Sequence, residues 1–579
     1  MDNQRLILWF ALAAILFLNF ETWQHDYNPP VPPAPAAATG APAVTGSAVP
    51  APPATSLSDA LPGVAPPPAT AAAPPAQPGS PVAAPAADTA FAATAPQAGP
   101  TIRVRTDVLD LEIALQGAEI RGETLLKYPK KKDSPTDLMR LFNADATEPL
   151  SLFQWGLTAG GTGPEPNHKA LFSASASSYV LNDNDEELVV PLTWTNGAGL
   201  TVTRTLRLKR GSYAIGLGQH VENSGRSPWR ARSYAQLLRH FQHTDRSMWN
   251  PDTYAFNGPA IYDGKKYQKL DAEKPDPDRL PKTAIAGGWA AAMQHHFVAA
   301  IVPDPTQPEE YALTVKDRDF LLRVVGPVID VPPGGSADVR ETLFAGPKLQ
   351  DQLAATGPKL ELTADYGRLT IIAQPLFWLL AQVHKVVGNW GLTIILVTFL
   401  IKLCFYPLAQ TSGRSMAKMR QLAPRMKAIQ ERYKDDREQL GKQMMELYKR
   451  EKVNPLAGCL PIIVQIPVFI SFYWVLLESV EMRQAPFVLW VQDLSTRDPY
   501  FILPAIMGAA MYGQFKLNPA PPDPVQAKVF AFMPLVMTAM MAFFPAGLVL
   551  YWITNTALSI AQQWRINQLV EASEKKSRG

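Results

Sequence analysis

Lys402 is the most informative single residue of the sequence, because its charged side chain lies inside the apolar run VTFLIKLCFYPL. A lysine that faces lipid at such a position costs about 2.5–3.5 kcal/mol, so it usually faces a polar cavity. Thr398 precedes it by one helical turn and offers a hydroxyl beside the charge. This pair predicts a site that attracts acidic groups without covalent chemistry. The alternative is a lysine that snorkels to the nearer membrane surface along its own stem.

Other polar side chains fall in the corresponding half of the neighbouring apolar runs, namely those of Gln465, Gln514, Asn555 and Ser559. The opposite halves are apolar and aromatic, as in VFISFYWVLL. Buried polar groups require partners or water. The pattern therefore predicts a hydrated groove that is open on one side of a membrane. A transporter or ion channel that uses Lys402 as a gating charge is the first rival, but it would need polar residues along the full span.

No arrangement typical of catalysis or metal binding stands out in the sequence. His240 and His243 have metal-like spacing, but no cysteine or cluster of carboxylates accompanies them. Cys404 and Cys459 lie in or beside apolar runs, as small buried hydrophobes do. There is no glycine-rich nucleotide loop. We therefore expect no enzyme activity, no metal and no small-molecule cofactor. A carbohydrate-active site in residues 101–350 is the second rival, because sequence alone does not place a histidine beside a carboxylate in a cleft.

The elements that must position Lys402 are apolar runs of membrane-spanning length, which is about 20 residues with a range of roughly 17 to 25. We expect a transmembrane core over residues 386–571, and we expect residues 1–23 to form an uncleaved anchor, because no cleavage site follows Leu6–Phe20. The fold class is then a multi-domain membrane protein with six transmembrane helices. The five core runs are 389–408, 457–477, 499–515, 529–544 and 548–564.

Charge predicts the orientation of these spans. The segment 413–453 contains twelve Lys or Arg residues and six Asp or Glu residues, and the tail 572–579 is also basic. Positively charged loops remain in the cytoplasm, so both termini and this segment are expected there. Hydrophobic residues at helical spacing predict that 413–453 is a helical hairpin. Its basic face could dock ribosomal RNA or anionic lipid, whereas its methionine-rich seam could be simple core packing; the basic residues are Arg414, Lys418, Arg420, Arg425, Lys427, Lys449 and Arg450.

The region before the core divides into three parts. Residues 24–100 are rich in Pro and Ala and are expected to be a disordered linker. Residues 101–352 alternate polar and apolar side chains, as in Leu200–Lys209, and are expected to form an antiparallel β-sandwich outside the cytoplasm. Arg204 is the single exception on the apolar face of that strand. Residues 353–385 are expected to contain an interfacial amphipathic helix, although a helix that caps the β-domain is the alternative.

The segments SMAKMRQLAPRMKAIQERY, QMMELYKREKVNPLAGCLPIIVQIPVFISFYWVL, VEMRQAPF and FFPAGLVLYW resemble the YidC branch of the YidC/Oxa/Alb insertases. The resemblance implies an insertase and chaperone of the bacterial inner membrane, of the Gram-negative type with a periplasmic β-supersandwich. It implies nascent membrane proteins as substrates, with the ribosome, the signal-recognition pathway, the Sec translocon and the lipid bilayer as partners.

The resemblance also implies roles for particular residues. Lys402 takes the place of the central positive residue, commonly Arg, and Thr398 lies near it. Tyr551 and Trp552 take the place of an aromatic pair that is often two tyrosines, and the indole can only donate a hydrogen bond. The apolar part of a substrate would leave along spans three and five; the residues expected to form this slide are Ile466, Phe469, Phe472, Phe532, Met533 and Met537.

Overall fold

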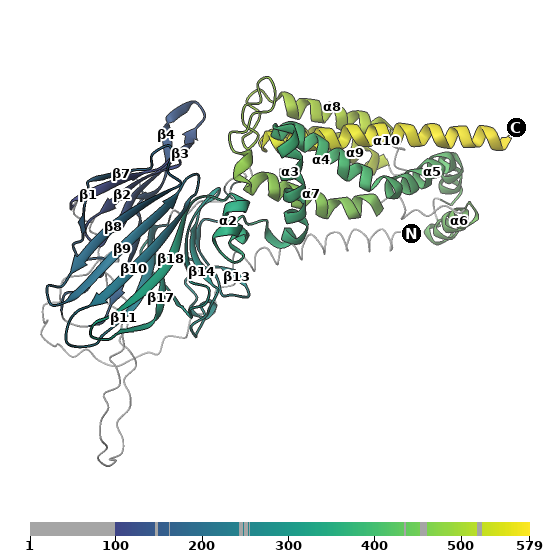
Figure 1. Cartoon of the computed structure of the whole chain (residues 1–579). Helices are drawn as coiled ribbons and strands as arrows, with labels where there is room; N and C mark the ends of the chain where they lie inside the picture. Colours follow the sequence, from purple (N-terminus) through teal and green to yellow (C-terminus); the bar gives the residue numbers. More distant parts are fainter. Residues whose placement is uncertain are drawn as a thin grey trace, which may run out of the picture.

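The computed structural model contains a β-domain and a set of helices, joined end to end (Figure 1). It describes residues 99–144, 149–160, 163–241, 247, 253, 255–433, 436–451, 460–517 and 524–578. The predicted anchor 1–23, nearly all of the predicted linker 24–100, and Cys459 lie outside the described residues.

Two nine-stranded sheets pack face to face in the β-domain, which agrees with the predicted antiparallel sandwich. Every pairing between strands is antiparallel except that of β1 with β7. The first sheet comprises β1 (Thr101–Arg105), β2 (Leu109–Ala114), β3 (Glu119–Lys131), β4 (Ser134–Asn143), β5 (Ser151–Thr158), β7 (Ser178–Val180), β11 (Trp229–His240), β16 (Glu310–Lys316) and β17 (Asp319–Val331). The second comprises β6 (Ser173–Ala174), β8 (Glu187–Thr195), β9 (Leu200–Lys209), β10 (Ala214–Asn223), β12 (Gly258–Tyr262), β13 (Tyr267–Lys269), β14 (Trp289–Met293), β15 (Phe297–Pro303) and β18 (Gly335–Pro347).

Alternation in β9 matches the sequence pattern, and the exceptional Arg204 has a structural explanation. Its side chain is fully buried between the sheets, 4.2 Å from the centre of the Phe172 ring. The guanidinium donates hydrogen bonds to the carbonyl oxygens of Gly117 and Pro166 and to the side chain of Gln219. Arg204 therefore supplies the donor for the carbonyl oxygen of Gly117, whereas that of Pro166 also accepts a hydrogen bond from the N–H of Leu157 at 3.1 Å.

Replacing Arg204 by leucine is expected to destabilise the β-domain by about 3 kcal/mol, because the carbonyl oxygen of Gly117 and the side-chain oxygen of Gln219 lose their donor at about 1–3 kcal/mol each. Limited proteolysis of the full chain in urea measures the change. Arg207→Leu is the matched control, since Arg207 lies on the same strand and makes only an exposed pair with Glu187 at 3.5 Å. Equal protease sensitivity of the two variants would show that the buried hydrogen bonds contribute little.

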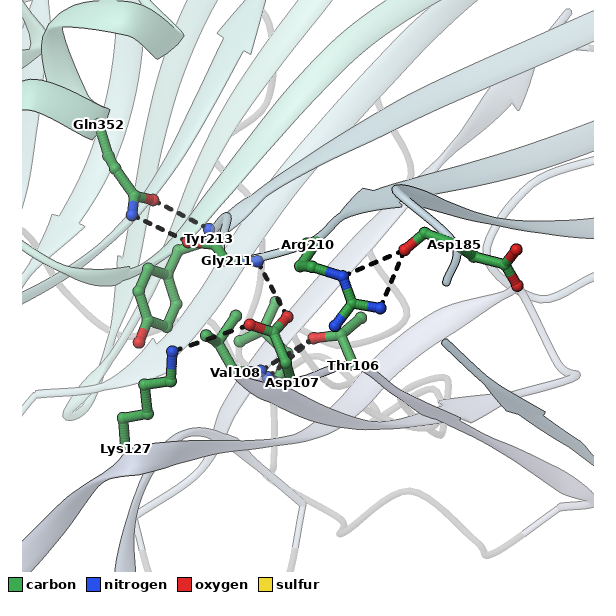
Figure 2. A network of polar contacts seen from close by, with 10 residues as sticks. Thr106, Asp107, Val108, Lys127, Asp185, Arg210, Gly211, Tyr213 and Gln352 are labelled. Carbon is green, nitrogen blue, oxygen red and sulfur yellow. Dashed lines mark hydrogen bonds and ion pairs between the residues drawn. The ribbon is translucent and has the colours of Figure 1, made fainter. Parts of the chain in front are cut away.

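The loop after β1 links the two sheets to the first helix of the chain's second half. The strand β1 ends before Thr106, whose Oγ1 accepts hydrogen bonds from the N–H groups of Val108 and Leu109. Asp107 then accepts a hydrogen bond from the N–H of Gly211 in the β9–β10 turn at 2.9 Å (Figure 2). Gln352 of α2 (Gln350–Thr356) binds the same turn through Gly211 O and Tyr213 N.

Eight further α-helices among the described residues form the other half of the molecule. They are α3 (Thr370–Val387), α4 (Trp390–Cys404), α5 (Tyr406–Arg432), α6 (Arg437–Arg450), α7 (Leu460–Glu478), α8 (Ile502–Leu517) and α9 (Pro524–Met541), and α10 (Ala546–Arg578) completes the chain. The β-domain lies at one end of these helices, and the α5–α6 hairpin lies at the opposite end (Figure 1). The helix α3 runs across the common direction of α7, α8 and α10 (Figure 1).

The second predicted span is broken rather than straight. The helices α4 and α5 meet at Phe405 with a bend of 62° between Trp390–Cys404 and Tyr406–Gly413. Pro407 in the first turn of α5 lacks an N–H group, which suits a helix start and not a helix interior. A straight helix would place Lys402 about 16 Å from Gly413 along the axis. The break instead puts Lys402 in the last turn of α4.

Length and composition alone do not reproduce the predicted number of spans. Among the described residues, Gly367–Val387 is the one unbroken helix long and apolar enough to cross a membrane, and the bent α4–α5 pair passes the same test together. Val464–Glu478 and Ala531–Met541 are shorter apolar helices. The count of six therefore stays a prediction, as does the interfacial position of α3.

A cluster of polar contacts joins the β-domain to the end of α7. His295 and His296, in the β14–β15 turn, stack with ring centres 3.8 Å apart. Their Nε2 atoms lie 3.0 and 3.2 Å from the carbonyl oxygen of Leu477. The buried ammonium of Lys348 donates to the carbonyl oxygen of His295 at 2.7 Å. Two neutral imidazoles thus hold the β-domain against a helix end.

This contact is expected to weaken in acid. Burial lowers the pKa of His295 to about 4 and that of His296 well below its usual value, and Lys348 and Arg483 act in the same direction. The unfolded chain, with a histidine pKa of about 6.5, then binds more protons between about pH 4 and 6.5. Stability is complete above that window and falls as the pH drops through it. We expect the thermal midpoint to fall by about 5 °C between pH 7.5 and pH 5.

The measurement is the thermal unfolding midpoint of the full chain as a function of pH. The double variant His295→Gln/His296→Gln is expected to make this midpoint less dependent on pH. His220→Gln is the control, because the exposed His220 pairs with Asp338 at 2.8 Å and its pKa is raised, which gives the opposite slope. If the thermal midpoint of the double variant falls in acid by as much as that of the native chain, the histidine pair is not the source of the pH dependence.

Candidate functional site: a polar pocket around Lys402

Lys402 reaches a polar partner on a helix far away in the sequence. Its Nζ donates a hydrogen bond to Ser559 Oγ of α10 at 2.8 Å. Ser559 in turn donates to the carbonyl oxygen of Asn555 at 2.7 Å, one turn earlier in the same helix. The half-buried ammonium therefore points between the helices, toward α10. No carboxylate lies within 4.0 Å of it among the described residues, so its charge is not neutralised by an ion pair.

A second hydrogen bond brings α7 to the same cluster. Gln465 Nε2 donates to Asn555 Oδ1 at 2.6 Å. Thr398 is buried and donates to the carbonyl oxygen of Ile394 at 2.6 Å, so its hydroxyl is satisfied within α4. Three helices that are distant in sequence thus contribute polar side chains to one place, as the sequence predicted for Lys402, Thr398, Gln465, Asn555 and Ser559.

All of these residues except Ser559 border a small pocket of about 40 Å³. A cavity needs roughly 10–15 Å³ by this measure to hold one water molecule, so about two or three waters fit. Its polar lining is formed by Thr398, Lys402, Gln465, Tyr551, Asn555 and Gln562, and its apolar lining by Ile401, Phe405, Leu408, Ala409, Val464 and Val468. Gln562 Nε2 is buried without a partner among the described residues, which also indicates a place for water.

Two expected groove residues lie elsewhere. Gln514 belongs to α8, and no described residue of α8 lines the pocket. Trp552 packs edge-on against Phe469 with ring centres 4.6 Å apart, whereas its neighbour Tyr551 lines the pocket. A helix presents consecutive residues about 100° apart, so only one of the two aromatics can face the pocket.

The pocket residues that the sequence analysis missed are apolar. They follow from helical spacing, because residues three, four or seven positions from Thr398, Gln465 and Asn555 share the same helix faces. From Thr398 this spacing reaches Ile401 and Phe405, whereas Ala409 lies beyond the bend, in α5. Because of the bend at Phe405, residues at the start of α5 line the same pocket as Lys402. No pattern in the sequence distinguished that bend from a straight span.

The expected slide residues divide into exposed and packed side chains. Ile466 of α7 and Phe532 and Met533 of α9 are 45 %, 66 % and 39 % exposed. Phe469 and Met537 are partly buried against the helix core. Phe472 is fully buried and stacks on Tyr551 with ring centres 4.5 Å apart. The exposed three present apolar side chains on the surface, whereas Phe472 packs behind Tyr551.

The hairpin packs through the predicted seam. Leu422 and Met426 of α5 meet Met444, Leu447 and Tyr448 of α6 in one buried cluster. Charged side chains lie outside it: Arg425 pairs with Glu451 at 2.8 Å, and Lys427, Lys449 and Arg450 are exposed. The side chains of Arg414, Lys418 and Arg420 lie outside the described part of the structure.

Other groups with possible chemistry are structural in character. His240 Nδ1 lies 2.8 Å from Asp319 Oδ1 across neighbouring strands, and His243 lies outside the described residues. Cys404 is a free, exposed thiol, so the expectation of a buried side chain was wrong for this residue. Within the described ranges, no three His, Cys, Asp or Glu side chains are placed to hold a metal ion.

Comparisons with known proteins agree with this architecture in both halves. The family described as "YidC periplasmic domain" matches residues 101–379, and the family described as "60Kd inner membrane protein" matches residues 382–574. The membrane protein insertase YidC of Nitrosococcus oceani is 44 % identical over 583 residues, which is 99 % of each chain. That of Thioalkalivibrio sulfidiphilus is 43 % identical over 588 residues and covers both chains completely. A crystal structure of an active YidC insertase aligns with 80 % of this chain at 17 % identity and a TM-score of 0.35.

A polar pocket among apolar helices, joined to a large two-sheet domain, defines an inner-membrane protein with a periplasmic domain. The chain belongs to the YidC family of membrane protein insertases.

Proposed function

We propose that this protein inserts other proteins into the bacterial inner membrane and assists their folding there. The observation that carries the proposal is the unneutralised ammonium of Lys402 within a polar cluster between α4, α7 and α10. An acidic or polar tail of a client would enter this pocket, and the pocket's hydrogen-bonding groups would replace part of the water that the tail loses. The relatives named as membrane protein insertases support the same activity.

The apolar part of a client leaves into lipid over the exposed faces of α7 and α9. Ile466, Phe532 and Met533 supply the apolar contacts along this route. Burial in lipid contributes about 0.8 kcal/mol for each CH₂ group, which drives release without nucleotide hydrolysis. The step needs no covalent intermediate, and we expect no cofactor.

The proposed topology has six spans, with both termini and the α5–α6 hairpin in the cytoplasm and the β-domain in the periplasm. Support comes from the excess of positive charge in 413–453 and from the position of the hairpin at the end opposite to the β-domain (Figure 1). The pocket then opens toward the cytoplasm. The exposed Lys427, Lys449 and Arg450 would receive the ribosome or the signal-recognition pathway, and the protein would act alone or beside the Sec translocon.

The direct test is reconstitution of the full chain in proteoliposomes with a single-span client that carries a short acidic tail. Protease protection of the tail measures insertion. We expect protection with the protein and little without it, at equal lipid and client concentrations. Equal protection in both samples would reject the proposed function. Conductance of the same proteoliposomes in a planar bilayer would identify a channel instead.

A further inference from the structure

A large cavity lies between the β-domain and the loop that joins α7 to α8. Its volume is about 740 Å³. The β3–β4 turn forms one wall with Lys130–Asp133, and residues 483–500 form the other. Ala546, the first residue of α10, also borders it, and α8 begins just past Tyr500. The cavity thus lies where two apolar helices begin, at the level of one membrane surface in the proposed topology.

Positive charge in this cavity is held in place but not neutralised. Arg483 donates to the carbonyl oxygens of Pro129 and Lys130 at 2.7 and 2.9 Å, and Lys132 donates to the carbonyl oxygen of Gln492. Lys131 and Arg497 are exposed. Among the described residues, none of these four cations has a carboxylate within 4.0 Å. Main-chain oxygens orient two of them, and their full charge faces the cavity.

Two of the three carboxylates that border the cavity are already engaged by their own loop. Asp493 accepts hydrogen bonds from the N–H of Gln484 at 3.0 Å and from both donors of Ser495. Asp498 accepts from Trp490 Nε1 at 3.1 Å and from the N–H of Leu503 at 2.7 Å, which caps α8. Asp493 also attracts Arg483 electrostatically, and the third carboxylate, Asp133, is exposed in the β3–β4 turn. An anion that enters the cavity therefore meets these four cations beside a smaller number of carboxylates.

An apolar surface continues from the cavity toward the helices. Leu489, Tyr500 and Phe501 are 76 %, 67 % and 45 % exposed. Ile502 and Ile506 of α8, next along the chain, are 38 % and 45 % exposed. Leu489 and Phe501 have φ values of 53° and 56°, a backbone region that is costly for residues with such side chains. The loop thus presents large apolar groups outward beside a cationic cavity.

We propose that this cavity binds the head group of an anionic phospholipid from the periplasmic leaflet, with its acyl chains along α8. The negative phosphodiester lies among Lys131, Lys132, Arg483 and Arg497, and the chains cover Phe501, Ile502 and Ile506. A free phosphate would meet the same cations but would leave the apolar surface uncovered. The bound lipid bridges the β3–β4 turn and the 483–500 loop, and so ties the β-domain to the helices. The inference rests on the proposed membrane placement.

The test uses the full chain in nanodiscs of phosphatidylcholine, titrated with phosphatidylglycerol while the thermal midpoint is recorded. We expect the thermal midpoint to rise and to reach a plateau at a low mole fraction of phosphatidylglycerol. Lys131→Ser/Arg497→Gln is expected to need about thirty-fold more phosphatidylglycerol, because each cation near the surface strengthens binding by about five-fold and the two factors multiply. Lys209→Ser/Lys265→Gln is the matched control, since it removes two exposed cations of the β-domain outside the cavity.

Equal titration curves for the two double variants would overturn the proposal, because general attraction to a charged membrane would then explain the effect. A midpoint that rises equally with soluble glycerol phosphate would assign the cavity to free phosphate and overturn the lipid as its occupant. Slower insertion of acidic-tailed clients by Lys131→Ser/Arg497→Gln in pure phosphatidylcholine would assign the cavity to clients and also overturn it. Client insertion by the native chain in the same nanodiscs separates failure of this proposal from failure of the proposed function.

Discussion

Lys402→Ala is expected to slow insertion of clients with acidic tails by about ten- to a hundred-fold, because a hydrogen bond to a charged group contributes about 1.5–3 kcal/mol. Clients with neutral tails should lose much less. Lys402→Arg should retain most of the activity, since the charge remains and Ser559, 2.8 Å from the native ammonium, can still accept a hydrogen bond. Lys402→Glu should be the most impaired variant, because it repels the acidic tail.

Initial rates of protease protection in proteoliposomes provide the measurement, with acidic and neutral forms of one client compared in parallel. Ser559→Ala is the matched control, because it removes the partner hydroxyl of Lys402 and leaves the charge in place. We expect this control to slow insertion by less than about five-fold, because the ammonium stays available to the acidic tail and loses only its contact with Ser559. An alanine variant that slows both client forms equally would mean that Lys402 acts through packing and not through charge.

Filling the pocket is expected to have a still broader effect. Ala409 lines the pocket at the start of α5, and a tryptophan there would occupy the space of about 40 Å³ that we assign to water and client. Ala409→Trp should reduce insertion of acidic-tailed and neutral-tailed clients alike, by about fifty-fold or more, since the loss of more than 2 kcal/mol is typical of an overpacked site.

Leu403→Trp is the control for this experiment. Leu403 lies next to Lys402 on α4, but its side chain is 58 % exposed and faces away from the pocket. The control should insert clients at a near-native rate. The thermal midpoints of both variants must be compared, because overpacking could also unfold the helices. Normal insertion by a well-folded Ala409→Trp protein would show that clients pass by another route.

Strands and helices could be predicted from the sequence where apolar residues recur at one regular period. The alternation in Leu200–Lys209 placed its apolar residues on the buried face, and the helical spacing of Leu422, Met426, Met444 and Leu447 placed them in the hairpin seam. Both patterns reflect burial of one face of a regular element, which sequence records directly.

The features that the sequence did not reveal depend on contacts between distant segments. Arg204 appeared as an exception on an apolar face, because its acceptors belong to Gly117 and Pro166 in separate loops. The bend at Phe405 was missed because a proline near an apolar run is compatible with either a kink or a new helix. The hydrogen bond from Arg483 to Pro129 joins two domains, and no local pattern predicts it.

Prediction of the pocket was better for polar residues than for aromatic ones. A polar side chain inside an apolar run needs a polar partner or water. Lys402, Gln465 and Asn555 therefore converge on the same cluster. An aromatic side chain such as Phe472 suits either a lipid-facing surface or a packed core, and here it packs on Tyr551. Gln514 lies near a helix end, where water can satisfy it without any pocket.

The most direct test of the account is a photo-crosslinking measurement during insertion. A benzophenone amino acid is placed in the full chain at Val468, which lines the pocket, or at Ile506, which is 45 % exposed on α8. A client with an acidic tail is then arrested part-way through insertion in proteoliposomes. The account predicts adducts between the tail and position 468, lost in the Lys402→Ala background, with few adducts at position 506. Tail adducts at position 506 but not at 468, while insertion proceeds normally, would contradict a route through the pocket.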